Sequence, residues 1–182
     1  MDKSKINDLK KMAESFILPS YEDIPDVGLF LEQVVRYVAK YAEPTGIQPL
    51  TGSMISNYVK KKIISNPVKK MYDRDQIAYL LFIAFTKNVI QLEDMQMLFD
   101  IQKKDHDIKD AYKYFTDQLR DCIFNVFRVE NRNTDTQKSE TSDPDTVFDH
   151  RTLLKNICIT VAHKIYLDSC IRLYTETGSE YL

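Results

Sequence analysis

Glycine, proline and cysteine are scarce in this chain of 182 residues, which has four glycines, six prolines, three cysteines and no tryptophan. With so few helix breakers, long helices are free to form. The cysteines, Cys122, Cys158 and Cys170, form no CxxC pair. An odd, sparse set of this kind favours reduced thiols in a cytoplasm over a disulfide framework.

Long apolar runs are also missing, since no segment approaches the roughly 18 apolar residues of a membrane-spanning helix. The N-terminal segment MDKSKINDLKK is charged and has no apolar segment behind it, which predicts no secretory signal. We therefore expect a cytoplasmic globular protein with no membrane partner. The net charge of -2 neither favours nor excludes nucleic acid, because local charge distribution decides that.

Motifs for catalysis and metal binding are absent from the sequence. The three histidines are far apart, and none stands four residues from another histidine or a cysteine. There is no phosphate-binding glycine loop and no nucleophile elbow. Cys122 and Cys158 fall on apolar helical faces, where a cysteine is usually a small buried hydrophobe. The sequence predicts no enzyme, no cofactor and no metal, and it leaves redox sensing open.

Apolar residues recur at helical spacing along most of the chain, which predicts an all-α protein with at most one small hairpin. Asp26, Thr51 and Asp73 are the expected N-caps, and Gln76 completes a capping box with Asp73. Expected helices cover residues 5–15, 27–41, 51 to before 62, 73 to about 87, 92–103, 107–129 and 149–175. The polar segment 130–146 is expected to be a flexible loop.

The most unusual stretch is GSMISNYVKKKIISNPVKKMYDRD, which begins at Gly52 and carries six cations. At about 100° per residue, its first part forms a helix with one apolar face and one polar face. The polar face consists of Ser53, Ser56, Asn57, Lys60 and Lys61. Lys62 falls in the apolar arc, so the helix should end by that residue. After a turn at Pro67, Lys69 and Lys70 are expected on a wing, and Tyr72 is expected to anchor the chain in the core.

Such a polar face suits a helix in the major groove of double-stranded DNA. Serine and asparagine can hydrogen-bond base edges or phosphates, and lysines neutralise phosphates. Lysine clusters are, however, more often solvated surface. The same basic patch could also dock an acidic protein partner, so a non-enzymatic protein-interaction module is the alternative.

Residues 50–99 resemble the winged helix-turn-helix head of MerR-type transcriptional regulators. The resemblance is carried by the pair Ile63-Ile64, by Tyr72 at the end of the wing, and by QLEDM at the start of a later helix. Residues 16–99 are also similar to a bacterial family called domain of unknown function 1836. The resemblance to MerR implies a DNA-binding transcriptional regulator with a small wing hairpin, followed by a helical C-terminal region.

Position by position, the resemblance identifies Ser56 with a DNA-contacting arginine and Asn57 with an aromatic residue. Tyr58 matches a tyrosine, Lys70 matches the wing arginine, and Lys62 replaces the glycine that ends the recognition helix. Loss of the arginine removes the best bidentate partner for guanine or phosphate, which implies weaker or differently aimed contacts. The predicted DNA-binding residues are Ser53, Ser56, Asn57, Tyr58, Lys60, Lys61, Lys69, Lys70 and Arg74.

We expect residues 1–104 to form the DNA-binding region and residues 105–182 a dimerisation or regulatory region. The terminal helix is apolar on nearly all sides beyond Tyr166, which predicts burial against a second subunit. Burial within a single chain, and a pocket for a small-molecule effector, are left open. A homodimer could read a palindrome across major grooves about 34 Å apart.

Overall fold

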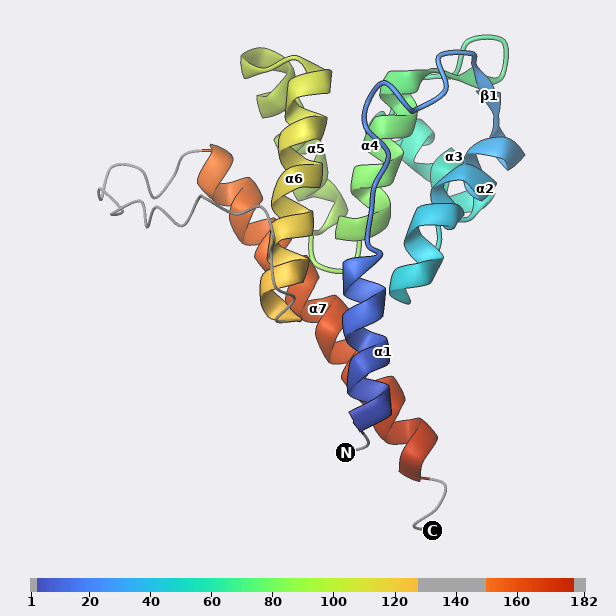
Figure 1. Cartoon of the computed structure of the whole chain (residues 1–182). Helices are drawn as coiled ribbons and strands as arrows, with labels where there is room; N and C mark the ends of the chain where they lie inside the picture. Colours follow the sequence, from blue (N-terminus) through green and yellow to red (C-terminus); the bar gives the residue numbers. More distant parts are fainter. Residues whose placement is uncertain (1–2, 128–149, 179–182) are drawn as a thin grey trace. The chain divides into compact units, whose positions relative to one another are not determined.

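The computed structural model describes residues 3–127 and 150–178, with side chains over 7–127 and 150–175 (Figure 1). Seven α-helices lie in these ranges: α1 (Lys3–Glu14), α2 (Leu31–Ala42), α3 (Gly52–Lys60), α4 (Arg74–Thr86), α5 (Leu92–Asp105), α6 (Ile108–Val126) and α7 (His150–Gly178). The short strands are β1 (Leu29–Phe30) and β2 (Met71–Tyr72), and a 3-10 helix covers Glu43–Thr45. The all-α prediction is confirmed, and the small two-stranded antiparallel sheet joins β1 to β2, whereas the predicted wing segment itself holds only an isolated bridge between Val68 and Met71. The predicted loop 130–146 lies outside the described residues.

Contacts divide the chain into two compact units. Residues 17–117 form one, called the central unit here, and residues 1–16 with 118–182 form the other, called the terminal unit. The boundary predicted after residue 104 falls inside the central unit. Helix α6 supplies residues to both units, so its two ends belong to different cores.

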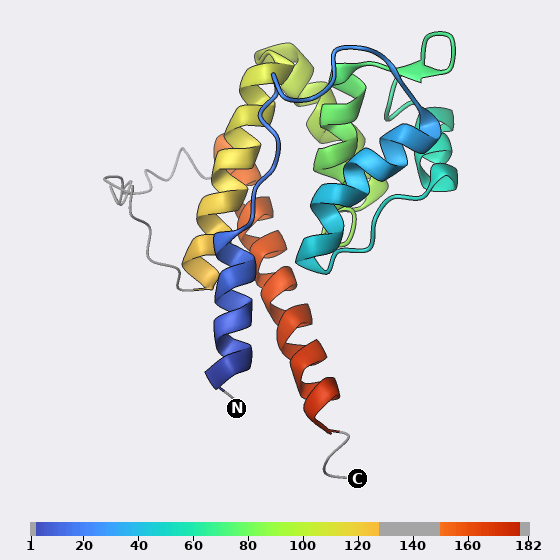
Figure 2. The same cartoon turned by 45° about the vertical axis from the view of Figure 1, so that its right-hand side comes forward.

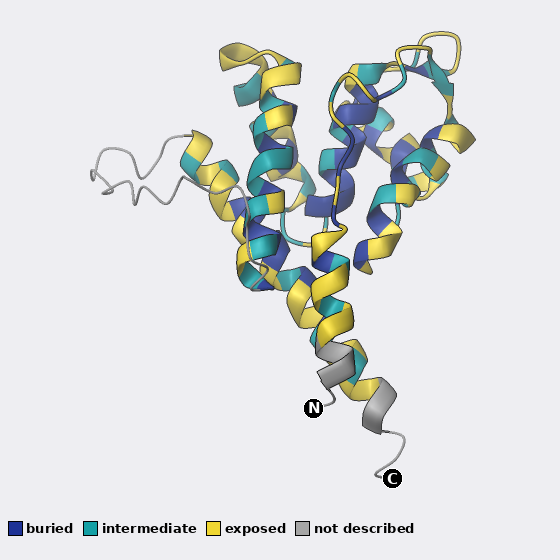
Figure 3. Cartoon of the chain, in the orientation of Figure 1, coloured by how far each residue is buried: buried dark blue, intermediate teal, exposed yellow. Residues whose placement is uncertain are grey.

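The core of the central unit is built around α4. This helix is buried along most of its thirteen residues, and α2 packs against α3, α4 and both strands. Phe82 of α4 contacts the rings of Phe99 and Phe115, at centroid distances of 5.5 and 4.8 Å. Figure 3 shows α4 largely in the colour of buried residues and the loop before β2 largely in that of exposed ones. A helix that is apolar on all sides is stable in water only when other elements cover all of its sides.

The start of α2 differs from the prediction, which placed an N-cap at Asp26. The helix begins at Leu31, and the Phe30 N–H donates to Gln33 Oε1 at 2.9 Å. Asp26 instead lies 3.9 Å from the guanidinium of Arg74. Residues 29–30 are extended because they pair with a distant strand, and this pairing overrides the local helical pattern.

The small sheet joins segments that are far apart in the sequence. Strand β1 pairs antiparallel with β2, with Leu29 opposite Tyr72 and Phe30 opposite Met71. Val68 forms a further antiparallel bridge with Met71. A Cβ on Gly28 would lie 2.7 Å from the Cβ of Met71. A Cβ atom is bonded directly to the backbone and cannot rotate away, so only glycine permits this close approach of the two strands.

The terminal unit contains the 29-residue helix α7. One face of α7 is buried and consists of Ile157, Cys158, Val161, Ala162, Ile165 and Ser169. Several apolar residues elsewhere on the helix are exposed, including Leu167 (54%), Ile171 (52%) and Tyr174 (68%). Within residues 3–127 and 150–178, no helix combines the length and apolar content needed to cross a membrane.

Candidate functional site

Helix α3 carries the predicted polar face. The Thr51 side chain caps it, accepting from the Met54 N–H at 3.2 Å, as the sequence predicted. Ile55 and Tyr58 are buried against the core. The polar-face residues Ser53, Ser56, Asn57, Lys60 and Lys61 are all exposed. Capping and apolar spacing together fix which side of the helix faces outward.

The polar side chains of α3 differ in whether they form hydrogen bonds within the protein. Ser53 Oγ lies 2.9 Å from the Thr51 hydroxyl. The Ser56 hydroxyl donates to the Gly52 carbonyl at 2.8 Å, which leaves it only acceptor capacity. The Asn57 side chain makes no hydrogen bond to any side chain or backbone group that the structure describes. Its carboxamide therefore offers both donor and acceptor to a ligand.

The end of α3 matches the prediction that the helix stops by Lys62. Lys61 is the C-cap, and Lys62 adopts a left-handed conformation with φ 62°. The Lys62 N–H donates to Val59 O at 2.9 Å, and the Ile63 N–H donates to Tyr58 O at 3.0 Å. This is the Schellman pattern, with lysine in the position that glycine usually occupies. The helix end thus needs no glycine, although lysine is strained there.

Two further lysines adopt left-handed conformations in the turn Val68–Met71, called the lysine turn here. Lys69 has φ 50° and Lys70 has φ 65°, and the Met71 N–H donates to Val68 O at 2.9 Å. Positive φ at both central residues defines a type I′ turn, for which Asn-Gly is the favoured sequence. In both views the loop that carries this turn extends away from the helices of the central unit (Figures 1 and 2).

Gln76 holds the base of this loop. Its side-chain amide N–H groups donate to the backbone carbonyl of Ser65 at 2.8 Å and to the Ser65 hydroxyl at 2.9 Å. Its side-chain Oε1 accepts from the backbone N–H of Asp73 at 2.9 Å, and the backbone N–H of Gln76 donates to Asp73 Oδ1 at 2.8 Å. The predicted capping box is therefore present, and the same side chain also ties the loop to the start of α4.

Charge near α3 and the lysine turn is mostly uncompensated. Lys61 lies 3.9 Å from Glu93, and both side chains are exposed, so the pair contributes little. Lys60, Lys62, Lys69 and Lys70 form no ion pair with any group in the described part of the chain. Four cations without internal partners are therefore available to an anionic ligand.

Two residues of the predicted DNA-binding set have side chains that contact other parts of the fold, and their role as DNA contacts stays a prediction. Tyr58 is 6% exposed, and burial raises the pKa of its hydroxyl. Arg74 donates through Nε to the Ile24 carbonyl at 2.8 Å and stacks over the ring of Tyr21, 5.5 Å from its centroid. Both side chains hold the fold together, since Arg74 fastens the segment before β1 to α4.

The remaining reactive side chains have ordinary surroundings. Cys122 and Cys158 are buried, as predicted, and burial raises the pKa of both thiols, which keeps them protonated near neutral pH. Among the described residues, no group of histidine, cysteine, aspartate and glutamate side chains could hold a metal ion.

Residues 19–115 match the sequence profile of a family described as domain of unknown function 1836 (DUF1836). The chain belongs to this family. The DUF1836 match nearly coincides with the central unit, residues 17–117, so the family corresponds to one compact unit. That unit contains α3, the lysine turn and the small sheet. No curated protein and no solved structure matched the chain. The similarity to MerR-type heads therefore remains a prediction.

Proposed function

We propose that the DUF1836 unit binds double-stranded DNA and that the protein is a transcriptional regulator. The observation that carries this proposal is the set of exposed cations on α3, just after its end, and in the lysine turn. Lys60, Lys62, Lys69 and Lys70 have no ion-pair partner among the described residues. Uncompensated lysines beside exposed hydrogen-bonding side chains are what phosphate contacts and base contacts require.

The order of elements supports a winged helix-turn-helix of the MerR kind. Helices α2 and α3 pack together, and the lysine turn and β2 follow α3. In such motifs the second helix enters the major groove, while the first crosses the backbone. The connection here, residues 43–51, is longer than the usual short turn because it includes the 3-10 helix Glu43–Thr45. In this arrangement α3 is the reading helix.

Asn57 is the base-reading residue in this proposal, since its carboxamide can pair with N6 and N7 of adenine. We expect Asn57→Ala to weaken binding to the preferred site by about 1–3 kcal/mol. Binding to random DNA and the slope of log affinity against log salt should stay unchanged, because no phosphate contact is lost. Ser56→Ala is the matched control, since its hydroxyl is already bonded to Gly52. A larger change of sequence preference for Ser56→Ala than for Asn57→Ala would contradict this assignment.

The direct test is selection of bound fragments from a genomic DNA pool, followed by gel shifts across a range of salt concentrations. We expect a shift that weakens steeply with salt, because the lysines displace counterions from phosphates. If neither the selected fragments nor random ones give a salt-sensitive shift, the alternative is favoured, in which the same patch docks an acidic protein.

We further propose that the protein acts as a homodimer through α7. The support is the exposed apolar surface of that helix, where Leu167 and Ile171 are each more than half exposed. Clustered exposed apolar residues mark interaction surfaces. A two-fold pair of reading helices would also match a palindromic operator.

Leu167→Glu with Ile171→Glu should convert the dimer to a monomer and raise its dissociation constant by roughly 100-fold or more. The reason is that each apolar side chain buried in the dimer interface contributes about 1.5–3 kcal/mol to binding. Light scattering at micromolar concentration measures the mass. Asn156→Glu with Thr160→Glu is the control, since it adds the same charge to exposed polar positions of α7. A wild-type chain of monomeric mass would contradict the dimer.

A further inference from the structure

Lys87 stands at the end of α4, and its side chain reaches a distant segment of the central unit. Its Nζ donates to the backbone carbonyl of Gln48 and, at 3.5 Å, to that of Pro49. Both carbonyls belong to the connection, residues 43–51, which leads from α2 into α3. One side chain therefore ties the end of α4 to the segment from which α3 starts.

Local hydrogen bonds hold the two ends of the connection but leave its middle to Lys87. At one end, the Thr45 hydroxyl donates to the Ala42 carbonyl at 2.7 Å. At the other end, the Thr51 side chain caps α3. Of the residues that the structure describes, only Lys87 donates hydrogen bonds to the stretch 47–50. The path of the backbone into α3 therefore depends on this lysine.

Stability alone does not account for a lysine at this position. The side chain is half-buried, and burial lowers the pKa of its amine. No carboxylate in the described part of the chain forms an ion pair with it. A cation in such a place loses hydration that an apolar side chain would not lose. The end of α4 does not use it either, since the Val89 and Ile90 N–H groups both donate to Thr86 O at 2.9 Å.

We infer that Lys87 is a positioning residue for base reading, because it fixes the backbone at Gln48 and Pro49 and thereby sets where the first turns of α3 lie. This inference rests on the proposed DNA binding. In helix-turn-helix proteins, the N-terminal part of the reading helix contacts the base edges. Binding groups of this kind must be held to within about 0.5 Å of their working position. Lys87 acts through α3, so it controls sequence preference and makes no phosphate contact of its own.

Loss of Lys87 should separate sequence preference from charge. The lysine turn keeps its phosphate contacts, so binding to random DNA and the slope of log affinity against log salt should stay at wild-type values. Binding to the preferred site should weaken, because Asn57 no longer meets its base in one fixed position. A lysine that contacted phosphate would instead reduce the slope by about 0.9 when it is lost.

The test compares Lys87→Met with Lys87→Arg in the full chain, on preferred and random DNA and across salt concentrations. Methionine is an unbranched, flexible side chain, and water can bond to the carbonyls it leaves, because Gln48 is exposed. We therefore expect a wild-type melting temperature. Binding to the preferred site should be roughly ten-fold weaker, about the loss of one base contact, with an unchanged salt slope. Lys87→Gln, whose shorter side chain keeps a polar end, is the second loss variant.

Two further readouts distinguish positioning from general support of the fold. Arginine keeps several N–H donors at the end of the side chain, so Lys87→Arg should restore the preference for the selected site. Amide hydrogen exchange over residues 47–56 should be faster in Lys87→Met, while exchange in the rest of the central unit should stay as in wild type.

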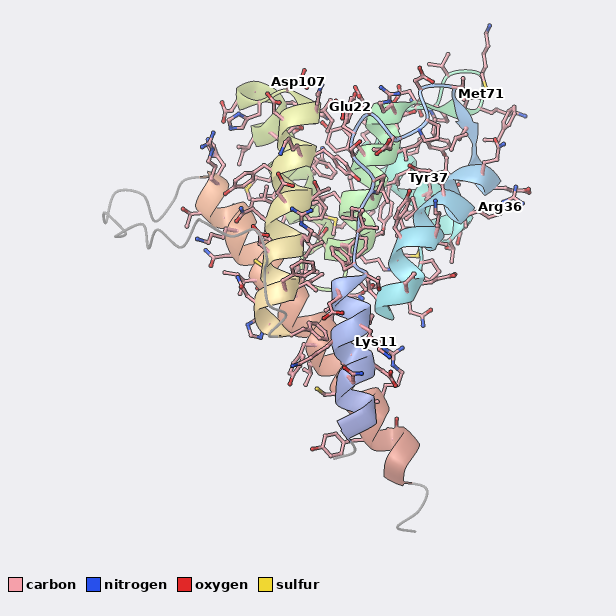
Figure 4. All side chains as sticks on the ribbon, in the orientation of Figure 1. Lys11, Glu22, Arg36, Tyr37, Met71 and Asp107 are labelled. Atoms are coloured by element: carbon pink, nitrogen blue, oxygen red, sulfur yellow. The ribbon has the colours of Figure 1, made fainter. Side chains whose placement is uncertain are left out.

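Lys11→Met is the matched control. Lys11, labelled in Figure 4, lies on α1 of the terminal unit, where its side chain is exposed and 3.9 Å from that of Asp8. The change makes the same substitution and removes the same charge outside the DUF1836 unit. Sequence preference, salt slope and exchange over residues 47–56 should all equal those of wild type.

Several results would overturn the inference. If Lys87→Met and Lys87→Gln bind the preferred site as tightly as wild type, Lys87 does not position α3, although DNA binding itself stands. If the slope falls by about 0.9, Lys87 contacts phosphate directly. If preference falls only in proportion to the melting temperature, or if Lys87→Arg does not restore it, the lysine merely supports the fold. If wild type shows no salt-sensitive binding, the proposed function and this inference fail together.

Discussion

Replacing Lys69 with asparagine and Lys70 with glycine is expected to make the protein more stable and a weaker DNA binder. Both lysines have positive φ, which costs a residue with a Cβ about 1–2 kcal/mol relative to an unstrained conformation. Asn-Gly is the preferred sequence for this turn. We expect the free energy of unfolding to rise by about 1–2 kcal/mol, and the melting temperature to rise by about 2–4 °C for each kcal/mol.

Binding should move in the opposite direction, because the variant loses two phosphate contacts. The slope of log affinity against log salt should fall by about 1.8, and affinity should drop roughly 10–100-fold at moderate salt. The loss should be the same for preferred and random DNA, since these contacts carry no sequence information. Thermal melting and salt-dependent gel shifts measure the two effects on one preparation.

Two control variants separate the effect of charge on DNA affinity from the effect of backbone conformation on stability. Lys69→Gln with Lys70→Gln removes the same charge without relieving the turn, so it should bind equally weakly and gain no stability. Lys103→Gln with Lys104→Gln removes equal charge from the end of α5. It should leave the salt slope near the wild-type value. If the slope of log affinity against log salt is unchanged in the Asn-Gly variant, the lysine turn does not contact DNA.

Gly28→Ala is expected to destabilise the central unit by about 1–3 kcal/mol. The added methyl would lie 2.7 Å from the Cβ of Met71, and neither atom can move without its backbone. Strand β1 must therefore shift away from β2, which loosens the support of the lysine turn. Thermal or urea unfolding would measure the loss of stability.

Gly52→Ala is the matched control for this change. Its Cβ would lie 3.4 Å from Leu31 Cδ2, at the flexible end of a side chain, and alanine is the better residue in a helix. We expect its stability to equal or exceed that of wild type. If Gly28→Ala proves as stable as Gly52→Ala, the close pairing of β1 with β2 is wrong.

Helix α3 and the lysines around it could be predicted from the sequence because the signals there are local. Thr51 caps the helix through its own side chain, and Ile55 and Tyr58 fall on its buried face at helical spacing. The apolar position of Lys62 on the helical wheel predicted where the helix ends. Such signals depend on neighbouring residues, and no distant segment competes with them.

Strand β1 and the role of Arg74 could not be predicted because they depend on residues far away in the sequence. Leu29 and Phe30 continue an apolar helical pattern, and only pairing with residues 71–72 makes them extended. From the sequence, Arg74 was predicted to belong to the basic cluster. In the structure its Nε–H donates to the Ile24 carbonyl. Long-range partners of this kind leave no trace in local composition.

The division of the chain also sets an order of events during synthesis. The central unit is continuous, whereas the terminal unit combines residues 1–16 with residues 118–182. On the ribosome, the central unit can therefore close as soon as its last residues emerge. Residues 1–16, made earlier, become part of the terminal unit only once residues from 118 onward have also been made. The two segments of the terminal unit are separated by the whole central unit, so the terminal unit can be completed only after the central unit has been made.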